Sequence, residues 1–371
     1  MHASHFFSRA CPLDSAILIM TCDVVIVGGG PAGATCAAFC AEAGLSTVVI
    51  ERAVFPREKV CGDCVNPACW PILERLAVAD RVCALPHSMI QEIEFFGTNG
   101  RSVRHRLAPS SRGEIAIKRS VLDQLLLTRA RELGAHLREG TTMTALEKGW
   151  SIQTTGETFR ARTLVAADGR NSTVARLLGL LPSLEKDRVG VQTHFPAPRD
   201  FGDRVVMRFH PRGYCGLASV GDEQLNLCLV STARHIGEIK SWAAREFSLP
   251  PEQEWRTITP LARAAVPAAH ANLLLVGDAA RVVEPFTGEG MYYALASGEL
   301  AARHIITGEP ASYVKSHAQL YRGRLWINQL AKQAVLHPRL ATLALRCPFA
   351  LRLLTQKVIS PARARGFSGR K

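Results

Sequence analysis

The stretch Gly28-Gly29-Gly30-Pro31-Ala32-Gly33 decides the fold of this 371-residue chain. The stretch Asp23–Val27, apolar from Val24 onward, precedes it and predicts a buried strand. Residues Pro31–Ala43 are typical of a helix, and Ser46–Ile50 predicts a second strand. Strand, glycine turn, helix and strand in this order form a β-α-β unit, whose two strands lie parallel. The fold class is therefore predicted to be α/β, with a parallel sheet covered on both faces.

The same glycines predict a site for the phosphates of a dinucleotide. Gly28 makes the tight turn, Gly30 lets the backbone approach a pyrophosphate, and Gly33 lets the helix pack on the strand. The positive end of the helix that begins at Pro31-Ala32 would face the phosphates. Glu51 follows about 20 residues later, where a carboxylate accepts hydrogen bonds from the ribose hydroxyls. These residues leave both NAD and FAD open.

Three later motifs narrow the choice of cofactor. Asp168-Gly169 ends the predicted strand Thr163–Ala167, and Gly277-Asp278 ends the predicted strand Asn272–Val276. Pro285-Phe286-Thr287-Gly288-Glu289-Gly290 follows before the predicted helix Gly290–Ile306, and residues Lys118–Leu133 predict a further, amphipathic helix. With the glycine stretch, these motifs resemble the flavoprotein group that includes para-hydroxybenzoate hydroxylase, flavin-dependent halogenases and geranylgeranyl reductases. The resemblance extends over residues 23–306.

The resemblance implies FAD and a role for each motif. Asp278 would bind the ribityl chain, Asp168-Gly169 would lie behind the pyrophosphate, and Arg119 would contact the ribityl–phosphate region. The amides of residues 288–291 would direct positive dipoles at one end of the isoalloxazine, where the reduced ring carries negative charge. The full set of expected cofactor-binding residues is Gly28, Gly30, Pro31, Ala32, Gly33, Glu51, Arg52, Arg57, Arg119, Asp168, Gly169, Gly277, Asp278, Pro285, Gly288, Gly290 and Met291.

The resemblance also implies the domain organisation. A Rossmann-like FAD-binding domain of the glutathione-reductase type is expected to be discontinuous, with an inserted antiparallel β-sheet substrate domain and C-terminal helices. Its expected segments are 20–87, 108–186 and 260–310, and those of the substrate domain are 88–107 and 187–259. Residues 1–19 are expected to be a disordered or non-native extension before a natural start at Met20. Residues 311–371 are expected to be a basic helical segment, broken at Pro338 and Pro348.

The stretch Phe55–Asp63 contains Lys-x-Cys-Gly and is similar to the geranylgeranyl reductase branch of this group. This similarity implies a reductase or dehydrogenase acting on a double bond of a hydrophobic, isoprenoid-like substrate. Cys61 is expected to lie beside the flavin as a weak proton donor, and Tyr214 to line the substrate pocket. Gly213-Tyr214 stands where that branch carries Gly-Tyr-x-Trp-x-Phe-Pro, but the Trp and Phe-Pro are missing here, so the substrate stays open.

Two other functions remain open. One is an NAD(P)H-dependent FAD monooxygenase that hydroxylates an aromatic or quinone-like compound, and the other is a flavin-binding protein without turnover. NAD(P)H is expected as a transient electron donor because no second G-x-G-x-x-G unit follows. Cys61-Gly62-Asp63-Cys64 follows a loop, which disfavours a thioredoxin-like disulfide, and no metal site is expected. His194 and His210 are further candidate proton donors in the substrate sheet.

The net charge of +13 is concentrated near the C-terminus. Twelve Lys and Arg follow the last acidic residue, Glu309, so the remainder is close to neutral and gives no indication of nucleic acid binding. Apolar residues alternate with these charges. This pattern fits peripheral contact with a membrane, or equally a solvated basic face of packed helices. Eleven scattered cysteines favour a reducing, cytoplasmic location. The oligomeric state is not indicated.

Overall fold

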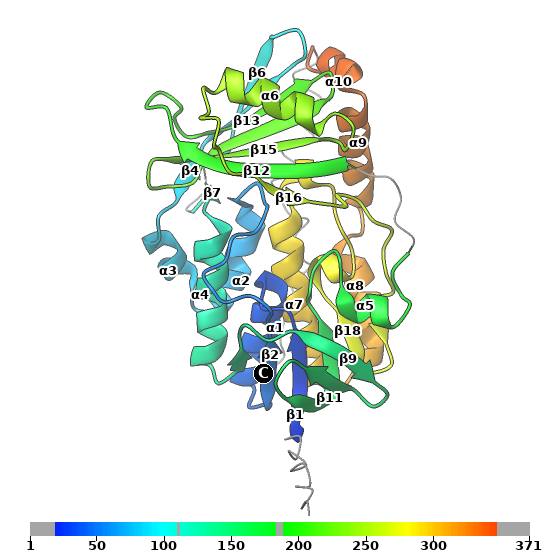
Figure 1. Ribbon diagram of the computed structural model, residues 1–371. Helices are drawn as coiled ribbons and strands as arrows, with labels where there is room; N and C mark the ends of the chain where they lie inside the picture. The colour runs from blue at the N-terminus through cyan, green and yellow to red at the C-terminus, as the bar shows by residue number, and fades with distance from the viewer. Residues whose placement is uncertain (1–18, 110–111, 183–187, 347–371) are drawn as a thin grey trace, which may run out of the picture.

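Two large sheets joined by long helices make up the computed structural model, which describes residues 19–109, 112–182 and 188–346. The first sheet, with β1, β2 and β11, lies at one end of the molecule, and the second, with β12, β13 and β15, lies at the other (Figure 1). Helix α7, Gly290–Ile306, runs between them, and its bounds are those predicted from the sequence.

Five parallel strands form the core of the first sheet, in the order β18-β11-β1-β2-β8. In β1, Val24 and Ile26 pack against helices, whereas Val25 and Val27 pack against the opposite layer. Since both faces are covered, residues Val24–Val27 of β1 form an unbroken apolar run instead of an alternating pattern. Antiparallel strands β9, β10 and β17 extend the sheet. The bounds are β1 Ile19–Val27, β2 Thr47–Ile50, β8 His136–Arg138, β9 Met143–Glu147, β10 Ser151–Thr154, β11 Thr158–Ala166, β17 Ala269–His270 and β18 Leu273–Leu275.

Helices α1, α4 and α7 cover one face of this sheet, and α5 with β9 and β10 covers the other. The predicted helix Lys118–Leu133 is confirmed as α4, with Leu122, Leu125 and Leu126 buried. Strand β1 already contains Ile19, which pairs with Thr158. Residues 1–18 lie outside the described part. The bounds are α1 Pro31–Glu42, α2 Trp70–Arg75, α3 Ala79–Ala84, α4 Arg119–Glu132 and α5 Thr173–Leu177.

The second sheet has the order β16-β12-β15-β14-β13-β5-β6. It was expected to be antiparallel, but β5 pairs with β13 in parallel. The two strands are far apart in sequence and no hairpin joins them, so nothing local imposes an antiparallel pairing. Helix α6, Ile236–Glu246, covers one face. The bounds are β5 Glu92–Phe96, β6 Ser102–Arg106, β12 Arg188–Pro196, β13 Arg204–His210, β14 Gly213–Ser219, β15 Gln224–Thr232 and β16 Arg256–Ile258.

A small third sheet, β3-β7-β4, lies between the two large ones. Its strands are Cys64–Val65, Glu114–Ala116 and Ser88–Ile90. Strand β4 was expected in the substrate sheet, but it pairs with β7 instead. One face of β7 packs toward the helical core and the other toward the second sheet, so this small sheet separates these two parts of the molecule.

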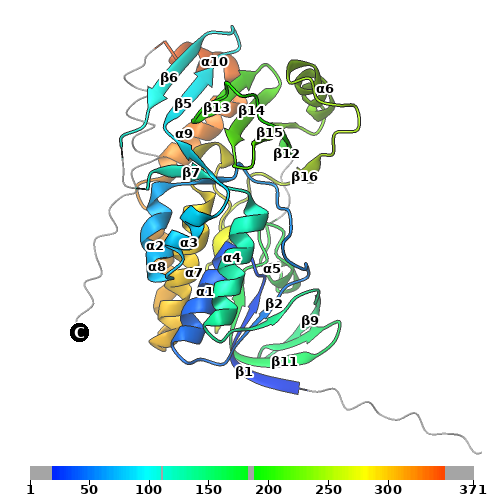
Figure 2. The same cartoon turned by 90° about the vertical axis from the view of Figure 1, so that its left-hand side faces the viewer.

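The described part of the C-terminal segment is helical. Helix α8, Tyr313–Leu320, packs on α7, whereas α9, Leu325–Leu336, and α10, Pro338–Ala344, rise beside the second sheet, on the side away from α6 (Figure 2). The predicted break at Pro338 separates α9 from α10, and Pro348 lies outside the described residues. None of the described helices combines the length and apolar character that a membrane span requires. Short 3-10 turns occupy Pro67–Cys69, Gly277–Ala279, Pro285–Thr287 and Pro310–Ser312.

Candidate active site

The glycine loop between β1 and α1 leaves little space for a side chain at Gly28 and Gly33 but open space at Gly30. A Cβ on Gly33 would lie 1.9 Å from the carbonyl oxygen of Gly28, and one on Gly28, whose φ is +107°, would lie 2.4 Å from that of Ala167. A Cβ on Gly30 would meet only Arg57 Nη2, at 3.4 Å. Gly28 and Gly33 are therefore required by the fold, whereas Gly30 leaves room beside the cavity for a ligand.

Glu51 holds this loop in place. Its carboxylate accepts hydrogen bonds from the backbone N–H of Gly29 at 2.7 Å and of Ala53 at 2.9 Å. Glu51 is buried, yet it also lines the cavity described below. A carboxylate has about four acceptor positions, so two amide bonds leave capacity for ribose hydroxyls.

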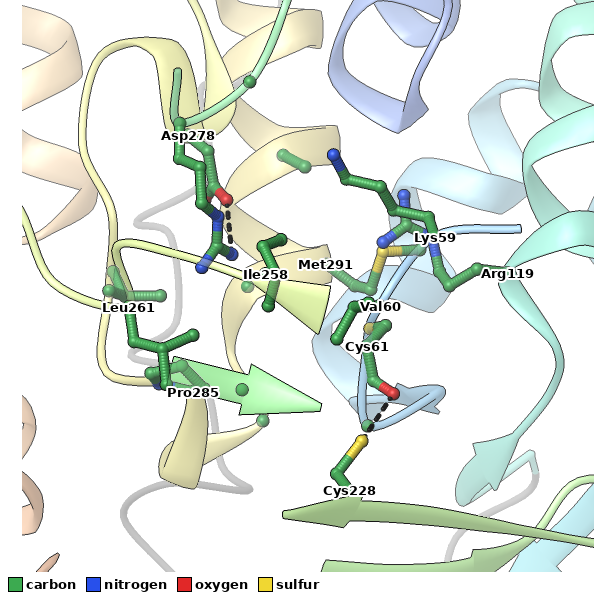
Figure 3. A pocket seen from close by; sticks show the side chains of 18 of the residues that line it. Lys59, Val60, Cys61, Arg119, Cys228, Ile258, Leu261, Asp278, Pro285 and Met291 are labelled. Carbon is green, nitrogen blue, oxygen red and sulfur yellow. Dashed lines mark hydrogen bonds and ion pairs between the residues drawn. The ribbon is translucent and has the colours of Figure 1, made fainter. Parts of the chain in front are cut away.

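Three basic side chains, Arg57, Lys59 and Arg119, line the cavity near the glycine loop. Arg119 donates two hydrogen bonds to the carboxylate of Asp123, one turn along α4, and Arg57 Nη1 lies 3.2 Å from the same carboxylate. Lys59 lies beside Arg119 (Figure 3). Burial and the charges of Arg119 and Arg57 lower the pKa of Lys59 to about 8. The carboxylate of Asp123 pairs with two of these three cationic groups, so this wall of the cavity is suited to an anion such as a pyrophosphate.

Two aspartates lie across the cavity from these cations. Asp278, in the turn after β18, accepts a hydrogen bond from Arg170 Nη2 at 2.9 Å, and its side chain is 31% exposed. Asp168 Oδ2 accepts from the amides of Thr173 and Val174 at 2.6 and 3.1 Å and so caps α5, while its buried Oδ1 has no hydrogen-bond partner. Asp278 therefore offers an accessible acceptor, whereas Asp168 mainly supports the loop that contains Gly169.

Helix α9 fixes the loop that precedes α7. Arg324 binds Glu289, and Asn328 Oδ1 accepts from the backbone N–H of Glu284 at 2.9 Å. Glu284 is in turn paired with Arg188 of β12 at 2.8 Å, and all four charged side chains are buried. The loop with Pro285, Gly288 and Gly290 is thus held from both α9 and the second sheet. Gly288 has φ +67°, a left-handed conformation that glycine adopts without strain.

The Cys61 loop is anchored by its backbone. The carbonyl oxygen of Cys61 accepts from Gln192 Nε2 at 2.8 Å, Asn226 Nδ2 at 3.0 Å and Cys228 Sγ at 3.0 Å (Figure 3). Asp63, with φ +60°, is buried and lies 2.9 Å from His194 Nε2. Burial raises the pKa of the Cys61 thiol. Cys61 and Cys64 are both free thiols, so the loop presents a neutral thiol to the cavity.

A single cavity of about 1150 Å³ joins these groups. It is lined by every residue expected to bind the cofactor except Gly33, and by both expected catalytic residues, Cys61 and Tyr214. Burial raises the pKa of Tyr214 well above its ordinary value, and its ring packs edge-on against Phe286 at 5.3 Å. Ligand pockets commonly measure roughly 300–1,000 Å³, so the space exceeds that of one ordinary ligand.

The far half of the cavity is apolar. Strands β5, β13 and β14 form one wall, and α9 and α10 form the other, with side chains that are aliphatic, aromatic or simply alanine. They include Ile93, Phe95, Met207, Phe209, Leu217, Ile327, Leu330, Ala331, Ala334, Ala341 and Leu345. This half can accept a long hydrophobic molecule.

Several residues of the site were not predicted. Asp123 stands four positions after Arg119 on a helix, and this spacing could have indicated the pair. Lys59 belonged to the Lys-x-Cys-Gly stretch but had no role assigned. Gln192, Asn226 and the Asp63–His194 pair had no local signal, because strands distant in sequence bring them together. His210 stacks on Trp242 at 5.0 Å and does not line the cavity.

A family model described as an FAD binding domain matches residues 21–304. The chain belongs to this FAD-binding family. Conditioned medium factor receptor 1 of Dictyostelium discoideum is 29% identical over 323 residues, covering 76% of this chain and 63% of that protein. Menaquinone reductase of Mycolicibacterium smegmatis is 29% identical and geranylgeranyl diphosphate reductase of Rhodobacter capsulatus 28% identical, covering 78% and 82% of both chains respectively.

The structure of the flavin-dependent brominase Bmp2 shares the fold, with a TM-score of 0.75 at 19% identity over 92% of this chain and 95% of that one. The geometry of the described residues fits FAD. Gly30 leaves space for a ligand, and the basic side chains of Arg57, Lys59 and Arg119 suit a pyrophosphate. The carboxylate of Asp278 is accessible. The chain is an FAD-dependent oxidoreductase.

Proposed function

We propose that this chain reduces a carbon–carbon double bond of a hydrophobic, isoprenoid-like substrate with reduced FAD. The observation that carries the proposal is the continuity of the cavity, which runs from the glycine loop and Asp278 into the apolar space between β13, β14 and the C-terminal helices. A cofactor at the polar end leaves the apolar half free for a long chain. Relatives named menaquinone reductase and geranylgeranyl diphosphate reductase support this choice.

The expected site residues take these roles within the proposal. The glycine loop, Glu51 and Arg52 bind the adenosine diphosphate part, Arg57 and Arg119 the pyrophosphate, and Asp278 the ribityl chain. The loop from Pro285 to Met291 holds the isoalloxazine. Cys61 lies at the flavin as a neutral thiol, and Tyr214 lines the substrate end.

Three finer features belong to the same proposal. The FAD domain is of the glutathione-reductase type, which the parallel sheet and its antiparallel extension support. The substrate domain comprises the second sheet. NAD(P)H is the transient electron donor, since the described residues contain one glycine loop of the dinucleotide type.

We also propose that the chain contacts a membrane surface through α9 and α10. Six large apolar side chains, each 44–64% exposed, cluster on these helices, and Leu330 both reaches the surface and lines the cavity. A lipid substrate could thereby enter the apolar half directly. The six side chains are Leu325, Trp326, Leu330, Leu336, Leu340 and Leu343.

The test is anaerobic single turnover. Protein carrying chemically reduced FAD is mixed with menaquinone or geranylgeranyl diphosphate, and flavin reoxidation is followed by absorbance while product mass is measured. The expected result is reoxidation with a product that carries two added hydrogens in its isoprenoid chain, because reduction of the quinone ring of menaquinone would give the same total mass. Reoxidation only on admission of oxygen, with a hydroxylated product from an aromatic compound, would replace the proposal by a monooxygenase. A bound flavin that no substrate or nicotinamide alters would indicate a protein without turnover.

A further inference from the structure

Glu114 is a buried carboxyl group that the cofactor site does not use. It begins β7, the central strand of the small sheet, and lies opposite Ile90 of β4. Side chains two positions apart on a strand share a face, so Glu114 points to the same side as Ala116. Ala116 packs with Val205 and Ala218 of the second sheet, whereas Ile115 packs into the helical core. Glu114 therefore faces the substrate side, and it lines the cavity.

This carboxyl group has no cationic partner among the described residues. Glu114 is 8% exposed, and its buried Oε2 has no hydrogen-bond partner. Other buried glutamates of the chain are compensated: Glu94 pairs with Arg104 and Arg204, Glu284 with Arg188, and Glu289 with Arg324. An unpaired buried carboxylate is costly, so such a residue is expected to stay protonated or to serve a function.

The surroundings of Glu114 favour its protonated form. Burial raises the pKa of Glu114 to about 7. The titratable groups nearest to it are the thiols of Cys64, on the neighbouring strand β3, and Cys69, in the adjoining 3-10 turn. Burial raises the pKa of both thiols, so neither adds charge near neutral pH. At neutral pH Glu114 thus exists in both forms and can exchange a proton.

We propose that Glu114 is the acid that delivers a proton to the substrate double bond. The inference rests on the proposed reductase function. Bound, reduced FAD supplies the hydride and with it both electrons. The π bond of the substrate breaks; one carbon receives the hydride and the other receives the proton of Glu114. Glu114 is left as a carboxylate, which solvent reprotonates, and a two-electron donor of the nicotinamide class restores the reduced cofactor.

The test compares wild-type protein with Glu114→Gln, which keeps the shape of the side chain but cannot act as an acid, and with Glu114→Asp, which retains a carboxyl group. Glu74→Gln is the control, because Glu74 is 54% exposed and pairs with Arg112 outside the cavity. General acids typically contribute 10²–10⁴-fold to a rate, so Glu114→Gln should slow anaerobic flavin reoxidation by substrate roughly 100-fold or more. Glu114→Asp should restore part of the rate, with a shifted pH profile.

A second readout needs no cofactor. In the infrared spectrum of the apoprotein, a protonated carboxyl band should disappear as the pH rises through about 7, and it should be missing from Glu114→Gln but present in Glu74→Gln. The wild-type reoxidation rate should fall over the same pH range, because only the protonated form donates. FAD affinity should be equal in all four proteins.

The outcomes separate the two proposals. Wild-type turnover with an unchanged rate in Glu114→Gln would overturn the role of Glu114 and leave the reductase function standing. A carboxyl band that persists in Glu114→Gln would also overturn it. Failure of the wild-type protein to reduce either substrate would overturn the reductase function, and with it the proton delivery that rests on that function.

Discussion

Two glycines of the β1–α1 loop, Gly33 and Gly30, have different roles. Gly33 is needed because its α-hydrogen faces the carbonyl of Gly28, where a methyl group cannot fit. Gly30 is surrounded by free space on the cavity side. Gly33 is therefore required for folding, whereas Gly30 is expected to matter for ligand binding. Substituting each glycine by alanine separates the two requirements.

Gly30→Ala should leave the thermal stability of the apoprotein within about 0.5 kcal/mol of wild type, since surface-facing changes without strain usually have effects of that size. It should nevertheless weaken FAD binding at least tenfold, which corresponds to about 1.4 kcal/mol. Gly33→Ala should instead lower apoprotein stability strongly. Thermal melts of both apoproteins and fluorescence titrations with FAD check this. Wild-type affinity in Gly30→Ala would show that no ligand approaches the loop there.

Lys59 is expected to make FAD binding depend on pH. Its pKa is lowered from 10.5 to about 8 in the folded chain, so the charged form is disfavoured by folding. Below pH 8 this lysine destabilises the apoprotein fully, and the effect is relieved as the pH rises from 8 toward 10.5. An anionic pyrophosphate favours the protonated lysine, so wild-type affinity for FAD should decline above pH 8.

Lys59→Met should therefore stabilise the apoprotein at pH 7, weaken FAD binding, and flatten the pH dependence of binding between pH 7 and pH 9.5. Calorimetric titrations in two buffers of different ionisation enthalpy should reveal proton uptake near pH 8 for wild type and none for the variant. Lys118→Met is the matched control, because Lys118 neighbours Arg119 but does not line the cavity. Equal proton uptake in Lys59→Met would exclude this lysine as the titrating group.

At the scale of elements, α9 connects the two functional halves of the cavity. Its first turn binds the loop before α7 through Arg324 and Asn328, and its inner face closes the apolar half. Val335 of α9, with Ala341 and Leu345 further along, packs against Phe95 and Phe209 of the second sheet. Helices α9 and α10 therefore pack into the core with one face and expose leucine side chains on the other.

The exposed side of α9 and α10 should bind anionic vesicles. Replacing Leu336, Leu340 and Leu343 together by Ser should reduce vesicle sedimentation at least tenfold, because burying a leucine contributes roughly 1.5–3 kcal/mol. Leu177→Ser is the control, since Leu177 is 49% exposed but lies on α5. Binding by wild type should fall with added salt, as charges are screened over about 8 Å at physiological ionic strength. Wild-type protein that ignores anionic vesicles at low salt would show that this face is only a solvated surface.

At the scale of the whole molecule, the cofactor is expected to connect segments that are far apart in sequence. The cavity is lined by the glycine loop, α4, the turn after β18 and the start of α7, so a dinucleotide bound there contacts all of them. Binding that is restricted to the folded state stabilises it by about 2.7 kcal/mol at a ligand concentration one hundred times Kd.

Purified protein should accordingly be yellow and release FAD on denaturation. FAD should raise the melting temperature of the apoprotein, whereas FMN at the same concentration should have little effect, because it lacks the adenosine that Glu51 and the glycine loop are placed to bind. Thermal melts and chromatography of the released flavin measure both. Release of FMN, or a colourless protein that does not respond to added FAD, would contradict the assignment of the site.

The sequence by itself determined the β-α-β unit, the positions of α4 and α7 and the residues at the polar end of the cavity. Each depends on local signals: apolar periodicity, glycines with fixed spacing, and acidic residues directly after buried strands. Parallel strands end at one edge of their sheet, so residues after β1, β11 and β18 had to meet there. This is why cofactor residues separated by more than two hundred positions could be named together.

Only the tertiary structure decided the apolar half of the cavity, the parallel pairing of β5 with β13 and the burial of Glu114 without a cationic partner among the described residues. These features depend on which distant strands become neighbours, and no local pattern specifies that choice. In sequence, Glu114 is an ordinary charged residue beside Ile115. Its burial without a cation from the described part of the chain follows from the packing of β7 between the helical core and the second sheet, because the strand must direct alternate side chains to opposite faces.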